Sequence, residues 1–122
     1  MVRFDEMDEK VTLAEQLEEN VSPVILIEKF NVRSEEVDQF LKTWADDVAY
    51  FKSQPGFISA QLHRGIGGSS VFVNYAVWES SIHFKKALNS IDLEAMLSDY
   101  PYSTMIFPHI FKKVSVPGVC GD

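Results

Sequence analysis

Hydrophobic and polar positions along the chain follow two periods, which divide it into strands and helices. Residues 24–32 (VILIEKFNV) are aliphatic and β-branched between Pro23 and Arg33, and they predict a buried strand. The next apolar residues recur at the spacing of an amphipathic helix, and Pro55 ends that helix because proline denies the next helical hydrogen bond. These residues are Val37, Phe40, Leu41, Trp44, Ala45, Val48 and Phe51.

The pattern after Pro55 predicts a hairpin, a helical region and a last strand. Residues 57–65 alternate apolar and polar positions, with Ile58, Ala60 and Leu62 on one side, and residues 71–78 (VFVNYAVW) form a second β-rich run after a glycine-rich loop. A serine cap begins a helix near residue 81, and Asp92 begins a short one. Residues 104–116 are strand-like, and Pro108 within them favours an edge position or a bulge.

This order of elements, β-α-β-β-α-β, predicts a ferredoxin-like α+β fold. It gives a four-stranded antiparallel sheet with both helices on one face. The other face is then left bare, which predicts a homodimer packed through its sheet faces. We expect residues 1–22 to be an acidic, solvated N-terminal extension, residues 23–116 to be the folded domain, and residues 117–122 to be a C-terminal tail.

Charge and composition exclude several classes of protein. The 122 residues carry a formal net charge of −7, and seven acidic residues lie within the first twenty. No basic stripe is available for phosphates, so we expect no nucleic-acid partner. No run approaches the length of a membrane span, and the acidic start is unlike a signal peptide, so we expect no membrane partner and a cytoplasmic protein.

The usual catalytic and metal-binding motifs are missing from the sequence. His63, His83 and His109 do not stand at metal-ligand spacing with each other or with acidic residues, and no metal site is expected. The serines near Gly68 lie in a predicted hairpin loop rather than in a nucleophile elbow. The single cysteine, Cys120, cannot form an internal disulfide.

Asn74 is a polar residue inside an apolar strand, and it points to the same side as Phe72, Ala76 and Trp78. A buried amide is costly unless it is paired, so Asn74 is either satisfied within the fold or directed at a ligand. Trp78 offers a flat ring and an N–H donor to a ligand, although on its own such a residue is more often part of the core. His63 and its neighbour in sequence, Arg64, point to opposite faces, so at most one of them lines a pocket.

Three short blocks together resemble the antibiotic biosynthesis monooxygenase domain of the dimeric α/β-barrel superfamily. They are residues 54–59 (QPGFIS), 62–64 (LHR) and 74–80 (NYAVWES), and the resemblance spans residues 23–116. It implies a monooxygenase without cofactors that oxidises an aromatic polyketide-type substrate, an anthrone or a quinol, with O₂. The catalytic pair would be Asn74 and Trp78, and we expect the substrate to contact His63, Phe72, Trp44 and Phe84.

The same resemblance leaves other functions open. Members of the superfamily that degrade heme carry an asparagine in the first strand, where this chain differs near Lys29, so heme breakdown is not expected. The alternative is a non-catalytic dimeric module that binds a small ligand or acts in a stress response.

Overall fold

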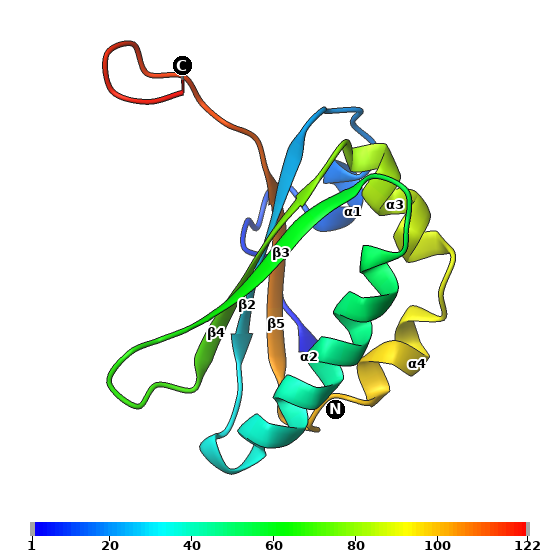
Figure 1. The fold of residues 1–122 in the computed structure, drawn as a ribbon, viewed down its shortest axis with the longest axis vertical. Helices are drawn as coiled ribbons and strands as arrows, with labels where there is room; N and C mark the ends of the chain where they lie inside the picture. Colours follow the sequence, from blue (N-terminus) through cyan, green and yellow to red (C-terminus); the bar gives the residue numbers. More distant parts are fainter. Residues whose placement is uncertain (1, 122) are drawn as a thin grey trace.

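The computed structural model describes residues 2–121 and contains one sheet and a layer of helices (Figure 1). The strands are β1 (Arg3–Phe4), β2 (Val24–Asn31), β3 (Phe57–Arg64), β4 (Val71–Trp78) and β5 (Met105–Phe111). The helices are α1 (Leu13–Gln16), a 3₁₀ turn (Ser34–Glu36), α2 (Val37–Lys52), α3 (Ser81–Asn89) and α4 (Leu93–Ser98). The predicted order of elements from residue 24 onward is therefore confirmed.

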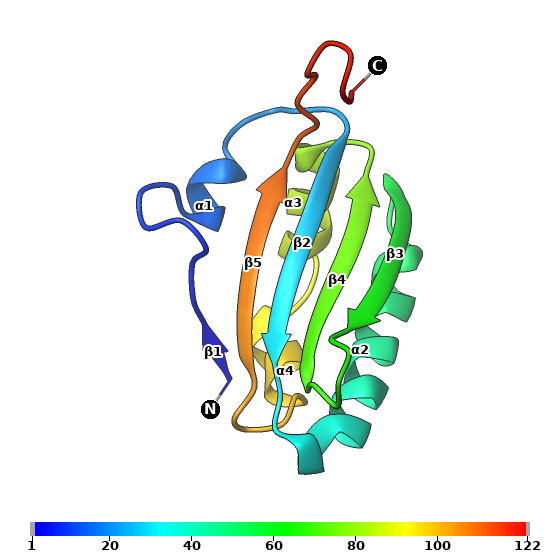
Figure 2. The ribbon, with the colours of Figure 1, turned by 90° about the vertical axis from the view of Figure 1, so that its left-hand side faces the viewer.

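The strands are arranged in the order β1-β5-β2-β4-β3. All pairs are antiparallel except β1 with β5, which is parallel. Helices α2, α3 and α4 cover one face of this sheet, here called the inner face (Figure 2). The opposite or outer face carries no helix, as the α+β prediction requires.

The core lies between the inner face and the helices, in two adjoining groups of side chains. One group surrounds Phe40 of α2, whose ring lies 5.0 Å from that of Phe30 and 4.8 Å from that of Phe72. The second surrounds Trp78, whose ring lies 5.4 Å from Phe84. The helix layer is thus held to the sheet mainly by aromatic contacts.

The N-terminal segment is not the solvated extension that its acidity suggested. Strand β1 pairs with β5 as a fifth strand, beyond the four expected. The side-chain amide of Gln16 also pairs with the backbone of Ile110: Nε2 donates to the carbonyl at 2.8 Å, and Oε1 accepts from the N–H at 2.9 Å. Ser81 binds the same segment by donating to the carbonyl of Glu19. Acidic side chains face solvent here while the backbone docks on the sheet.

Pro108 occupies the kind of position that its missing N–H predicts. The carbonyls of Thr104 and Ile106 accept hydrogen bonds from the β1 segment, so alternate residues of β5 face that outer edge. Pro108 is the next residue on this side, between the pairing of β1 and that of Gln16. Strand β5 is therefore not an edge strand, since β1 lies outside it, but no strand needs a donor from residue 108 at this point.

Strand β3 differs from the simple alternation expected. A register shift between Phe57 and Ser59 inserts an extra residue, and Ile58 is 53% exposed instead of sharing a face with Ala60. Phe57 contacts the Trp78 ring at 5.4 Å instead. The bulge comes directly after the turn at Gly56. This residue has a φ of +86°, and a side chain here would collide with the His83 ring, so the turn requires glycine.

Residues 112–121 leave the sheet as an exposed C-terminal segment that projects from the body (Figure 1). An isolated bridge between Val116 and Cys120 closes a small turn in it. Within residues 2–121, no helix is both long and apolar enough to cross a membrane.

Replacing Gln16 with alanine should lower the free energy of unfolding by about 1–2 kcal/mol, because both hydrogen bonds to Ile110 are lost. Urea denaturation followed by circular dichroism measures this change. Glu9→Ala, at an exposed position of the same segment, is the matched control and should leave the midpoint unchanged. Equal midpoints for wild type and Gln16→Ala would show that the segment adds nothing to the stability of β5.

Candidate functional site

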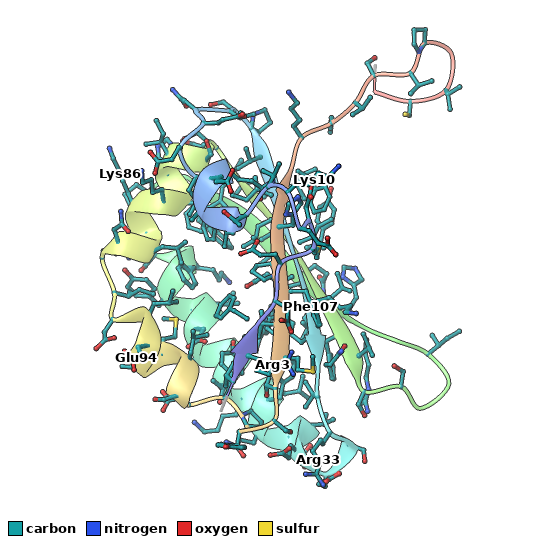
Figure 3. The ribbon with its side chains drawn as sticks, turned by 180° about the vertical axis from the view of Figure 1, so that it is seen from behind. Arg3, Lys10, Arg33, Lys86, Glu94 and Phe107 are labelled. Carbon is teal, nitrogen blue, oxygen red and sulfur yellow. The ribbon has the colours of Figure 1, made fainter. Side chains whose placement is uncertain are left out.

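A cavity of about 100 Å³ lies between the inner face of the sheet and the helices. Most of its lining is apolar, and the walls come from β2, β3, β4, β5, α2, α3, α4 and the N-terminal segment. The polar exceptions are Glu28, Asp47, Asn74 and the hydroxyl of Tyr100. In Figure 3, Glu94 points away from the body on the helix side, and Phe107 lies on the opposite side of the sheet.

Asn74 and Trp78 both reach this cavity from β4. They are 4% and 1% exposed, and the two-residue period of the strand puts both on the inner face. The Trp78 ring is surrounded by Phe51, Phe57 and Phe84 at 5.4–6.2 Å. Trp78 is therefore a core residue and a wall of the cavity at the same time.

The structure brings together only some of the residues expected to contact a substrate. Trp44 of α2 and Phe84 of α3 line the cavity. Phe72 packs against Phe40 in the core and is not part of the lining. His63 is exposed on β3 and lies outside the lining, while Arg64 extends over the Phe72 ring at 5.2 Å. The structure therefore does not bring His63 and Phe72 together with Trp44 and Phe84 in the cavity lining.

Glu28 and Asn74 form the central polar pair of the cavity. They are direct neighbours across β2 and β4, and Nδ2 of Asn74 donates to Oε1 of Glu28 at 3.0 Å. Oδ1 of Asn74 is buried and has no hydrogen-bond partner within the protein. A buried acceptor without a partner is unusual, so this oxygen is available to a ligand that carries an O–H or N–H.

A second carboxyl group, Asp47 of α2, stands beside Tyr100 on the cavity wall. Burial raises the pKa of Asp47 to about 6, although hydrogen bonding with the Tyr100 hydroxyl acts in the opposite direction. Burial and the charge of Asp47 in turn raise the pKa of Tyr100 well above its usual value. The hydroxyl of Tyr100 thus keeps its proton and can donate it in a hydrogen bond.

Three polar residues of the cavity were not predicted from the sequence: Glu28, Asp47 and Tyr100. Glu28 could have been found, because it alternates with Val24, Leu26 and Phe30 on the buried side of its strand. Asp47 could also have been noticed, because it lies on the apolar face of its helix, between Trp44 and Phe51. Its meeting with Tyr100 depends on the folded chain, because the two residues come from separate elements.

No group of three or more metal-ligating side chains occurs within the described chain. Cys120 is exposed in the C-terminal segment, far along the chain from every residue of the cavity lining.

Solved structures with the same fold include oxygenases. SnoaB, a cofactor-independent oxygenase from Streptomyces nogalater, superposes with a TM-score of 0.70 at 22% identity, over 80% of this chain and 99% of its own. A protein from Shewanella loihica PV-4 gives 0.66 at 23% identity, over 78% and 97%. Rv0793 from Mycobacterium tuberculosis gives 0.64 at 15% identity, over 80% and 100%. Comparison with curated proteins gave no match.

The sequence profile of the family described as antibiotic biosynthesis monooxygenase matches residues 23–98. This segment holds β2 to α4 and includes Glu28, Asn74 and Trp78. The chain therefore belongs to the antibiotic biosynthesis monooxygenase family. Strand β5 and the N-terminal segment, which complete the cavity, lie outside the match.

Asp47→Asn should stabilise the protein near neutral pH. The unfolded pKa of about 3.8 rises to about 6 on folding, so between these values the folded state holds more protons and the free energy of unfolding falls as pH rises. We expect Asp47→Asn to be more stable than wild type by about 1 kcal/mol at pH 7, allowing for solvent near this half-buried group, and by much less at pH 4.

Urea denaturation at both pH values measures this difference. Asp38→Asn, at an exposed position of the same helix, is the control and should follow the wild type more closely across the range. A constant difference between Asp47→Asn and wild type at pH 4 and pH 7 would contradict the raised pKa.

Proposed function

We propose that this protein is a monooxygenase that oxidises a small aromatic substrate, an anthrone or a quinol, with O₂ and without a cofactor. The observation that carries the proposal is the placement of Asn74 and Trp78 on the same face of β4, with Ala76 between them, in the wall of an apolar cavity. Membership of the monooxygenase family and the fold shared with SnoaB, itself a cofactor-independent oxygenase, support it.

Asn74 is the residue that orients the substrate in this proposal. Its amide nitrogen carries two N–H groups, one of which is used by Glu28. The second N–H can donate to a substrate oxygen that becomes negatively charged, and the unpartnered Oδ1 can accept from a substrate hydroxyl. A fixed donor in a site with little water stabilises a developing oxyanion strongly, and this makes an electron-rich enolate able to react with O₂ directly.

The aromatic walls define the shape of the substrate. Trp78, Phe84 and Trp44 present rings to the cavity, which suits a flat, apolar ligand. A cavity of about 100 Å³ is of the order that holds a single aromatic ring, because a dry engineered cavity of about 150 Å³ binds benzene in another protein. A three-ring anthrone would require a wall to move, and α4 and the N-terminal segment are the walls built from the shortest elements.

Oxygen uptake by the purified protein with single-ring quinols and with anthrones, without added metal, flavin or heme, tests the proposal. Asn74→Ala should lower turnover by about 100-fold, because a donor to the oxyanion is removed. Asn89→Ala, at an exposed position of α3, is the matched control and should retain wild-type turnover.

Saturable binding of the same compounds with no oxygen uptake would contradict the oxygenase function and favour the alternative, a non-catalytic module that binds a small ligand. Uptake that is equal in wild type and Asn74→Ala would remove Asn74 from the mechanism.

The protein is further proposed to be a homodimer that packs through the outer faces of its sheets. That face presents an apolar surface without a covering layer, and Lys29 lies over the Phe107 ring at 4.4 Å within it. Tyr75, in the middle of β4, is 41% exposed there. A surface of this kind on a small protein is typical of a subunit interface. A cytoplasmic location likewise stays a prediction.

Tyr75→Arg should convert the dimer to a monomer, because it places a charge at the centre of the interface. Light scattering coupled to size exclusion should give twice the chain mass of 13.9 kDa for wild type and the chain mass for the variant. Tyr102→Arg, on the exposed loop before β5, is the matched control and should stay dimeric. A wild type that is monomeric at micromolar concentration would contradict the proposed interface.

A further inference from the structure

Glu28 is an acidic side chain in a cavity that holds no basic one. It projects from β2 on the same side as the core residues Leu26 and Phe30. The cavity lining contains no lysine, arginine or histidine among the described residues. A carboxylate in an apolar cavity without a cationic partner lowers the stability of the fold. Such groups are typical of functional sites, so Glu28 is a candidate for a chemical role.

Asn74 holds the Glu28 carboxyl group in a fixed position. The two residues face each other across the β2–β4 pair, and Asn74 donates to Oε1 only, at 3.0 Å. The second carboxylate oxygen, Oε2, has no hydrogen bond of this kind and is free to take a proton. On the other side of β2 the residue opposite Glu28 is Pro108, which also lines the cavity.

We propose that Glu28 is the general base that removes the acidic proton of the substrate, an inference that rests on the oxygenase function proposed above. Asn74 positions the Glu28 carboxyl group and the substrate. Asp47 suits this task less well, because its carboxyl group interacts with the Tyr100 hydroxyl, whereas the Asn74 amide donates its hydrogen bond to Glu28. The proposal adds a catalytic carboxylate to the pair on β4.

The reaction balances with O₂ as the oxidant. Glu28 takes a proton from the methylene carbon of an anthrone, and the electron pair stays on the substrate as an enolate. One electron passes to O₂, and the two radicals join in a C–O bond to give a peroxide, which Glu28 protonates. Glu28 then takes the second proton of the same carbon as the O–O bond breaks. The quinone carbonyl forms, and the hydroxide that leaves receives that proton and becomes water.

The surroundings of Glu28 support its role as a base. Burial and the charge of Asp47 raise its pKa above the ordinary 4.5, while the hydrogen bond from Asn74 lowers it by a smaller amount. A base with a raised pKa accepts a proton more readily near neutral pH. The groups that face it are Asn74 from β4, Asp47 from α2, Tyr100 after α4 and Pro108 from β5.

Deuterium exchange at the methylene carbon of a substrate tests the base without any oxidation. The protein is incubated anaerobically in D₂O with anthrone, or with the smaller carbon acid 2-indanone, and loss of the methylene signal is followed by proton NMR. Wild type should accelerate exchange, and Glu28→Gln should reduce that acceleration by about 100-fold or more. Glu94→Gln, an exposed position on α4, is the matched control and should exchange like wild type.

The wild-type exchange rate should also rise with pH above the ordinary glutamate range, as the Glu28 carboxyl group loses its proton, which tests the proposal even where Glu28→Gln does not fold. Exchange no faster than in buffer with both compounds overturns the proposal, and so does exchange that Glu28→Gln leaves intact. Exchange that depends on Glu28 but is not followed by oxygen uptake in air supports the base and rejects the oxygenase. Oxygen uptake that Glu28→Gln leaves unchanged rejects the base and keeps the oxygenase.

Discussion

The register between β2 and β4 is the constraint on which the rest of the site depends. It sets Glu28 directly opposite Asn74, and the same alternation directs Trp78 and Leu26 into the protein. Because side chains alternate along a strand, a slip of one residue would turn Glu28 and its apolar neighbours to the outer face. The buried aromatic residues that resist such a slip therefore also hold Glu28 opposite Asn74. The same packing that stabilises the fold thus sets the geometry of the site.

Much of the fold could be predicted because the apolar residues repeat regularly, at strand or helix spacing, along most elements. The strand 71–78 alternates strictly, so the inward direction of Asn74 and Trp78 followed from counting residues by two. The helix over residues 37–52 followed from its apolar stripe and the proline after it. The prediction failed where local patterns compete with long-range contacts, as in β3, where Ile58 lies in a bulge, and in the acidic segment, where Gln16 docks through its side chain.

The site was less predictable than the fold, for a physical reason. Its walls come from eight elements, and the polar residues Asp47 and Tyr100 meet only because α2 and the chain after α4 pack over the same part of the sheet. His63 shows the opposite case: it belongs to a sequence motif, but its side chain is exposed on β3 and outside the cavity lining, so its contact with a substrate stays a prediction. Glu28 could have been predicted without the structure, because an acid that alternates with Leu26 and Phe30 in the apolar run VILIEKF faces the core side of the strand.

The N-terminal segment has one more consequence, which concerns association rather than catalysis. A sheet edge with free N–H and C=O groups invites pairing with other chains and leads to aggregation. On β5 this edge is occupied by β1, by Pro108 and by the Gln16 amide in succession. On β3, the opposite edge, the bulge near Ile58 interrupts the flat hydrogen-bonding pattern. The outermost strand on one side, β1, is only two residues long, and β3 on the other side is interrupted at one end, so pairing through a sheet edge is disfavoured relative to association through the sheet faces.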